Sequence, residues 1–238
     1  MKLTTICKKI IMGVSGLILI LFLIGHLIGN LTILLGAEAF NGYAHFLMSL
    51  GHGMLIYVFE AGIIIFFAAH VITGIQTALL NRSARDEDYL DKADAGGASR
   101  KTIASKTMIY TGLVMLLFIV MHVNHFKFGA GAEQEYVTNV HGEEARDLYR
   151  LVVEEFKKPM VSLAYVIAIG IMFFHLRHGF WSAFQSLGVG SKRLTPILNV
   201  AGIILSIILV FGFVLLPLYV LFFVNPPDLT AAAHGAGS

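Results

Sequence analysis

The stretch LFLIGHLIGN, residues 21–30, places His26 inside an apolar run that is long enough to cross a membrane. Three further stretches repeat the arrangement: IFFAAHVITG at 65–74 with His70, LFIVMHVNHF at 117–126 with His122, and IMFFHLRHGF at 171–180 with His175. An ionisable side chain inside a bilayer is costly and usually marks a functional site. The four histidines therefore indicate a site that is built within the membrane.

The composition indicates a membrane protein. Of 238 residues, 57% are hydrophobic and only 13% are charged, whereas soluble domains average about 25% charged residues. Five apolar segments exceed the roughly 20 residues that a spanning helix needs; they run over about 10–35, 53–81, 106–128, 159–187 and 197–224. Lipid offers open backbone groups no partner, so these segments must be helices. We predict one domain, residues 1–238, that is an all-α bundle of five transmembrane helices.

The N-terminus and the cysteine content limit other interpretations. The single cysteine, Cys7, excludes an internal disulfide and any zinc or iron–sulfur site made of several cysteines. The basic start MKLTTICKK precedes a long apolar run without a small-residue cleavage site. We therefore expect this run to be retained as the first span.

Lysine and arginine predict the orientation. The N-terminal tail carries three, the second-to-third connection six and the fourth-to-fifth connection two, eleven in all, whereas the opposite side carries five. The richer side usually faces the cytoplasm. We expect a multi-pass protein of a bacterial inner (cytoplasmic) membrane, with the N-terminus in the cytoplasm and the C-terminus outside.

Three of the connections between the spans have sequence patterns that predict their structure or role. AEAFNGYAHFLMSLG at 37–51 and EEARDLYRLVVEEFKKP at 143–159 have apolar residues at helical spacing. Both predict short amphipathic helices on the outer surface. The connection 84–101 is polar, mixed in charge and rich in glycine. It is a solvated connection by default and a candidate dock for a cytoplasmic subunit.

Depth within the spans divides the histidines into two pairs. At about 1.5 Å per residue, His26 and His122 each lie 16 residues, or roughly 24 Å, from the cytoplasmic end of their spans. His70 and His175 lie roughly 16–18 Å from that end. We name His26 and His122 the outer pair, and His70 and His175 the inner pair. Histidine is a common axial ligand of haem iron, so two level pairs predict two b haems.

Alternatives remain open from the residues alone. His125 and His178 follow His122 and His175 by three residues, and they share a helix face with them, so each can replace its neighbour as ligand. Intramembrane histidines also bond neighbouring helices or relay protons in transporters. A transporter is favoured by scattered acids and broken helices, but the predicted spans contain one acid, Glu60. Glu60 either bonds a neighbouring helix or has a proton role.

At the four histidines the chain resembles the cytochrome b membrane anchor of succinate dehydrogenases and fumarate reductases, in its single-subunit, five-helix, two-haem form. The matching stretches are LIGHLIGNLTILLG, FFAAHVITG, VMHVNHF and HLRHGFWSAFQSLG, in this order, and the resemblance covers about residues 5–224. It implies that the outer pair holds one haem and the inner pair the other. The family places a glycine and an aromatic run after the last ligand, which favours His175 over His178.

The resemblance also implies partners and a reaction. A flavoprotein subunit with FAD and an iron–sulfur subunit would pass electrons between succinate or fumarate and membrane quinone by way of this chain. The dicarboxylate site would then lie on a partner, and this chain would be the quinone-reactive membrane subunit. We expect menaquinone as the quinone, contacts with membrane lipid, no nucleic acid, and a higher oligomer of the whole complex. The alternative is the di-haem cytochrome b of a formate dehydrogenase or hydrogenase.

The chain departs from part of that family in two positions. Some fumarate reductases have a glutamate two residues before the fourth ligand, where this chain has Phe173, and another that falls at 41–45, where it has no carboxylate. The proton-transfer role of those glutamates is not carried over, and succinate oxidation is favoured.

The stretch FNGYAHF predicts a quinone site near the outer pair. Asn41, Tyr43 and His45 offer hydrogen-bond donors for quinone carbonyls at the outer end of the first span. The alternative is an interfacial helix whose Tyr43 anchors among headgroups. A site beside the inner haem would instead use Ser15, Arg82 and Trp181.

Overall fold

The computed structural model describes residues 4–83, 103–128 and 136–225. In this part of the chain five helices are long and apolar enough to cross a membrane, which confirms the predicted fold class. They are α1 (Thr5–Leu31, extended by the 3₁₀ helix η1, Thr32–Leu35), α3 (Met54–Ser83), α4 (Ile103–Phe126), α6 (Pro159–Ser186) and α7 (Leu194–Phe223). The connection 84–101 lies outside the described residues.

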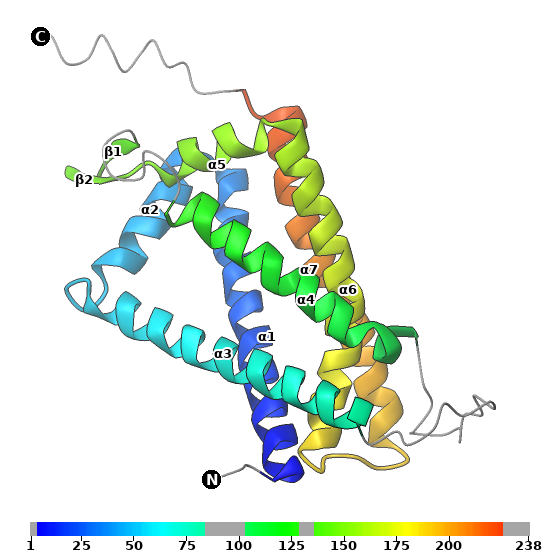
Figure 1. Ribbon diagram of the computed structural model, residues 1–238. Helices are drawn as coiled ribbons and strands as arrows, with labels where there is room; N and C mark the ends of the chain where they lie inside the picture. Colours follow the sequence, from blue (N-terminus) through cyan, green and yellow to red (C-terminus); the bar gives the residue numbers. More distant parts are fainter. Residues whose placement is uncertain (1–3, 84–102, 129–135, 226–238) are drawn as a thin grey trace, which may run out of the picture.

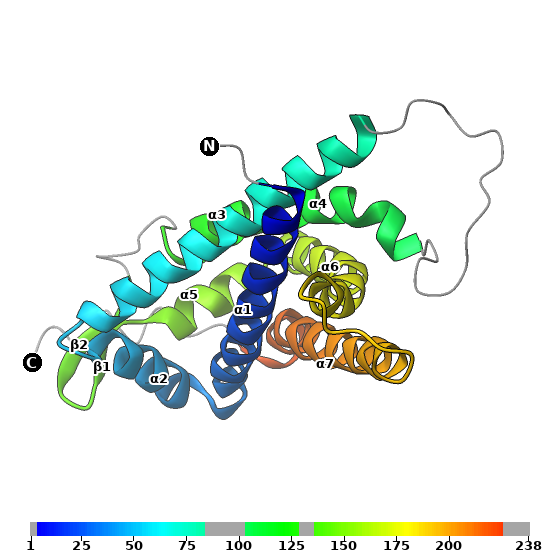
Figure 2. The ribbon, with the colours of Figure 1, turned by 90° about the horizontal axis from the view of Figure 1, so that it is seen from below.

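Helix α1 occupies the middle of the bundle. It packs against α3 on one side and against α6 and α7 on the other, as the view from below shows (Figure 2). Helix α6 packs along α7 and also contacts α4. Helix α3 therefore packs mainly against α1, and α4 packs mainly against α6.

The two ends of the bundle differ in structure (Figure 1). The start of α1, the end of α3, the start of α4 and the α6–α7 turn lie at the lower end. The upper end carries a cap, which we define as α2 (Ala37–Ser49), β1 (Val137–Val140), β2 (Glu143–Arg146) and α5 (Leu148–Phe156). Which end faces the cytoplasm stays a prediction.

The spans begin and end where local signals require. Helix α1 begins at Thr5, five residues earlier than predicted, because Thr4 Oγ1 accepts a hydrogen bond from Cys7 N at 3.2 Å and caps the helix. Gly36 follows η1 with a φ of +98°, a conformation that glycine adopts without strain, and it redirects the chain into α2. Pro159 opens α6 at the first turn, where its missing N–H costs nothing.

The segment 143–159 is not one amphipathic helix as predicted. Its first four residues form β2, which pairs antiparallel with β1, and α5 begins only at Leu148. The reason is a two-residue turn in which His141 and Gly142 have φ of +52° and +91°, the geometry that closes a tight hairpin. Asp147 then starts α5 by accepting a hydrogen bond from Arg150 N at 3.0 Å.

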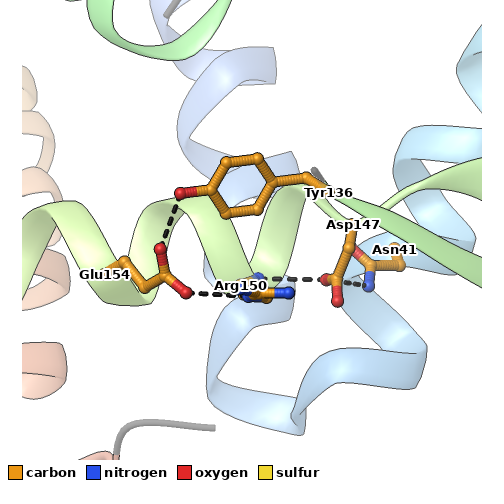
Figure 3. Close-up of polar contacts among 5 residues, drawn as sticks. All are labelled: Asn41, Tyr136, Asp147, Arg150 and Glu154. Carbon is orange, nitrogen blue, oxygen red and sulfur yellow. Dashed lines mark hydrogen bonds and ion pairs between the residues drawn. The ribbon is translucent and has the colours of Figure 1, made fainter. Parts of the chain in front are cut away.

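Polar contacts hold the cap together (Figure 3). The buried Asn41 of α2 donates from Nδ2 to Asp147 Oδ1 at 2.8 Å, and its Oδ1 accepts from Tyr149 N at 2.8 Å. Glu154 of α5 accepts from Tyr136 Oη at 2.6 Å and from Arg150 Nε at 2.7 Å. The side-chain amide of Asn41 therefore joins α2 to the start of α5.

Candidate functional site

The structure brings the four histidines together in the two predicted pairs. His26 on α1 faces His122 on α4 with ring centroids 5.8 Å apart. His70 on α3 faces His175 on α6 with ring centroids 6.3 Å apart. Each pair therefore joins two helices that are not consecutive in the chain.

The spacing within each pair fits one metal ion between two imidazoles. Metal–imidazole bonds are about 2 Å long, so two imidazoles on opposite sides of one metal have ring centroids about 6 Å apart. No cluster of three or more metal-ligating side chains occurs in the described residues. Haem iron takes only its axial ligands from the protein, so two imidazoles per site match that group.

The inner pair is held by polar groups on neighbouring helices. His70 Nδ1 lies 3.2 Å from Met12 O and 3.4 Å from Ser15 Oγ, both on α1. His175 Nδ1 lies 3.2 Å from Thr111 Oγ1 on α4. All of these contacts are made by Nδ1, and within the described residues no hydrogen bond engages Nε2 of either ring.

Two glycines make room for the inner rings. A Cβ added at Gly16 would lie 3.1 Å from His70 Cε1, and one added at Gly112 would lie 3.3 Å from His175 Cε1. Neither glycine was predicted from the sequence, because both lie on the facing helices α1 and α4. The available signal was a hydroxyl residue followed by glycine within a span, which occurs as Ser15-Gly16 and Thr111-Gly112.

The outer pair lies among aromatic rings. Phe22 stacks on His26 with centroids 5.3 Å apart, and Phe118 and Phe126 flank His122 at 5.9 and 5.4 Å. In the described part of the chain His122 Nδ1 is buried without a hydrogen-bond partner. The outer pair is thus flanked by aromatic rings, in contrast to the inner pair, whose Nδ1 atoms contact polar groups of neighbouring helices.

The alternative ligands His125 and His178 have other neighbours. The His125 ring stacks on Tyr165, with its Nδ1 3.4 Å from Tyr165 Oη. The His178 ring makes an edge contact with Trp181. Neither makes a ring contact with another histidine among the residues that the structure describes, which favours His122 and His175 as the paired side chains.

The predicted quinone residues have three different surroundings. The Asn41 amide is occupied by Asp147 and α5. The Tyr43 ring lies against Gly29, where an added Cβ would be 2.5 Å from Tyr43 Cε1. His45 Nε2 lies 3.1 Å from Glu143 Oε2 of the hairpin. Tyr43 is therefore placed one helical turn past His26, and it is the candidate best placed beside the outer pair.

The structure also places most of the other residues that were singled out in the sequence. Glu60 forms an ion pair with Lys127, just past the end of α4, so it bonds a neighbouring helix as one of the two interpretations predicted. Ser15 contacts His70 and Trp181 contacts His178. The side chain of Arg82 lies outside the described residues.

The chain is similar to the succinate dehydrogenase cytochrome b558 subunit of Bacillus subtilis (strain 168). The two are 25% identical over 172 residues, which are 71% of this chain and 73% of that protein. The similarity supports the family predicted from the four histidine stretches. No protein-family model and no solved structure matches the chain.

Proposed function

We propose that this chain is the di-haem cytochrome b membrane anchor of a succinate:quinone oxidoreductase. The observation that carries the proposal is the pairing of four imidazoles from four helices at centroid distances of 5.8 and 6.3 Å. The similarity to a succinate dehydrogenase cytochrome b558 subunit selects this family among di-haem membrane cytochromes. One-electron transfer is the chemistry that two bound b haems would supply.

The histidines would be the protein ligands of the haem iron in this proposal. His26 of α1 and His122 of α4 would hold one haem, and His70 of α3 and His175 of α6 would hold the other. The packing of these helices sets the spacing of the two rings in each pair. The aromatic residues around the outer pair exclude water from the site.

The partners are the soluble subunits of the complex. We infer that a flavoprotein subunit with FAD and an iron–sulfur subunit dock at the lower end of the bundle in Figure 1. The start of α1 and the α6–α7 turn lie at that end. They carry the exposed cations Lys9, Lys192 and Arg193, which supply a surface for an acidic partner. The dicarboxylate reaction belongs to the flavoprotein, and this chain exchanges electrons with quinone.

The quinone would react near the outer pair, close to the cap. Tyr43 and His45 are the donors on α2 that we assign to its carbonyls, whereas the Asn41 amide is taken up by the cap. Succinate oxidation with menaquinone as the acceptor is the direction and the substrate that we propose.

Purification with native partners tests this function. The complex should contain a covalent-flavin subunit and an iron–sulfur subunit, show a b-type reduced-minus-oxidised spectrum, and catalyse succinate:quinone reduction. Co-purification with a formate dehydrogenase or a hydrogenase would assign the chain to the other class of di-haem cytochromes. Absence of any haem spectrum would leave the transporter interpretation.

A further inference from the structure

Each imidazole of the inner pair rests on a hydroxyl residue followed by glycine on another helix. Ser15-Gly16 of α1 faces His70 of α3, and Thr111-Gly112 of α4 faces His175 of α6. In both places the hydroxyl approaches Nδ1 while the glycine leaves space beside Cε1. The same local arrangement thus occurs on two different helices, toward the two rings of one pair.

The contacts of His70 define which nitrogen carries the proton. Met12 O, 3.2 Å from His70 Nδ1, is a carbonyl oxygen and can only accept, so the hydrogen must lie on Nδ1. Ser15 Oγ donates its own hydrogen to Ile11 O at 2.6 Å, which leaves its lone pairs to accept from His70. The neutral ring therefore keeps a free lone pair on Nε2.

Thr111 makes the equivalent hydrogen bond with His175. Its Oγ1 lies 3.1 Å from Met108 O and 3.2 Å from Thr107 O, so its hydrogen is directed to a carbonyl of its own helix. The oxygen then accepts from His175 Nδ1 at 3.2 Å. Both inner rings thus present an unprotonated Nε2, which is the form that binds a metal.

The outer pair lacks this arrangement. His122 Nδ1 has no hydrogen-bond partner among the described residues. Within the described residues the polar side chain near the His26 ring is Asn30 of its own helix, 3.4 Å from each ring nitrogen, and that amide donates to His26 O at 2.8 Å. In this part of the chain, hydrogen bonds from neighbouring helices therefore reach the rings of the inner pair and not those of the outer pair.

We propose that Ser15 and Thr111 are positioning residues for the inner haem: each accepts a hydrogen bond from Nδ1–H of one ligand histidine and so leaves Nε2 of that ring unprotonated and available to bind the iron. This inference rests on the proposed function, in which the inner pair holds a haem. A hydrogen bond from the second nitrogen fixes the ring orientation and makes the ligand more basic. A more basic ligand stabilises ferric iron, so loss of the hydroxyl should raise the midpoint potential of the inner haem.

The test is an optical redox titration of the purified complex carrying Thr111→Val. The inner haem, identified by its absence in His70→Ala, should show a higher midpoint potential, while the outer haem keeps its own. Thr111→Ser should restore the wild-type value. Ser15→Ala should act in the same direction but more weakly, because Met12 O still accepts from His70.

Matched controls separate this role from packing. Thr77 is half-buried and Ser206 is buried, and their hydroxyl groups donate to carbonyls of their own helices at 2.7 and 2.6 Å. Thr77→Val and Ser206→Ala should leave both potentials unchanged.

Several outcomes would overturn the proposal. These are an unmoved inner potential in Thr111→Val with both haems present, an equal shift in Thr77→Val, or loss of the inner haem in Thr111→Ser as well as in Thr111→Val. Loss of the inner haem in Thr111→Val with its retention in Thr111→Ser and Thr77→Val supports the proposal. A wild-type complex without two b haems would contradict the proposed function first, and the positioning role would fall with it.

Discussion

Tyr43 is a polar side chain of the cap that lies against the end of α1 beyond His26. Its ring covers Gly29, one turn after that histidine. We expect Tyr43→Phe and His45→Ala to slow quinone-linked turnover about tenfold or more in combination, since each removes a hydrogen bond of about 1 kcal/mol or more. Succinate oxidation by an artificial acceptor should persist, and so should both haem spectra.

The control for this prediction is Tyr57→Phe, which alters an exposed tyrosine at the start of α3. It should leave quinone turnover unchanged. Normal turnover in the double variant would move the quinone site away from α2, and Ser15, Arg82 and Trp181, the residues predicted for a site at the inner haem, would be the next ones to substitute.

For individual residues, the sequence predicted how deep each histidine lies in its span, but not which side chains it contacts. A helix rises by a constant amount per residue, so counting from the span ends was sufficient to pair His26 with His122 and His70 with His175. The direction of a side chain around the helix axis depends on which helices pack together. For that reason Thr111 was not predicted at all, and Asn41 was assigned to a quinone although its amide joins α2 to α5.

Among the elements, the spans were predicted closely and the hairpin was missed. An apolar run of membrane length is a strong pattern, and the predicted ends of α3, α6 and α7 differ from the observed ones by a few residues. The hairpin depends on four-residue strands and on one turn at His141-Gly142. Because this pattern is so short, the helical spacing of the apolar residues after it led to the prediction of a helix over the whole segment 143–159.

The cap should be sensitive to acid through Glu154. Burial by itself raises the pKa of this carboxyl, but hydrogen bonds from Tyr136 and Arg150 outweigh burial and hold the pKa below its ordinary value of 4.5. A carboxyl with a lowered pKa in the folded state contributes stability above its unfolded pKa, and this contribution is lost as the pH falls from 4.5 through the folded value.

The measurement is the melting temperature of the purified protein between pH 7 and about pH 3.5, the range over which carboxyls titrate. Glu154→Gln should lose less stability than the wild type over the acid part of this range. The matched substitution Glu144→Gln, at an exposed residue of β2, should follow the wild type. Identical acid profiles for Glu154→Gln and the wild type would refute the role of this carboxyl.

For the molecule as a whole, orientation decides where the partners bind. The charge bias predicts that the iron–sulfur subunit contacts the 82–106 connection and the α6–α7 turn, where Lys192 and Arg193 are exposed. Amine-reactive crosslinking of the intact complex should therefore join that subunit to Lys192 and not to Lys158, an exposed lysine beside the cap. Crosslinks to Lys158 in place of Lys192 would show that the orientation is inverted.

The central claim is that one chain holds two haems, each between a defined pair of histidines. Haem quantification and difference spectra of the purified complex test it most directly, in the wild type and in four single histidine-to-alanine variants. We predict two b haems in the wild type, loss of one and the same spectral component in His70→Ala and His175→Ala, and loss of the other in His26→Ala and His122→Ala. A single haem in the wild type, or an unchanged spectrum in His122→Ala, would contradict the account.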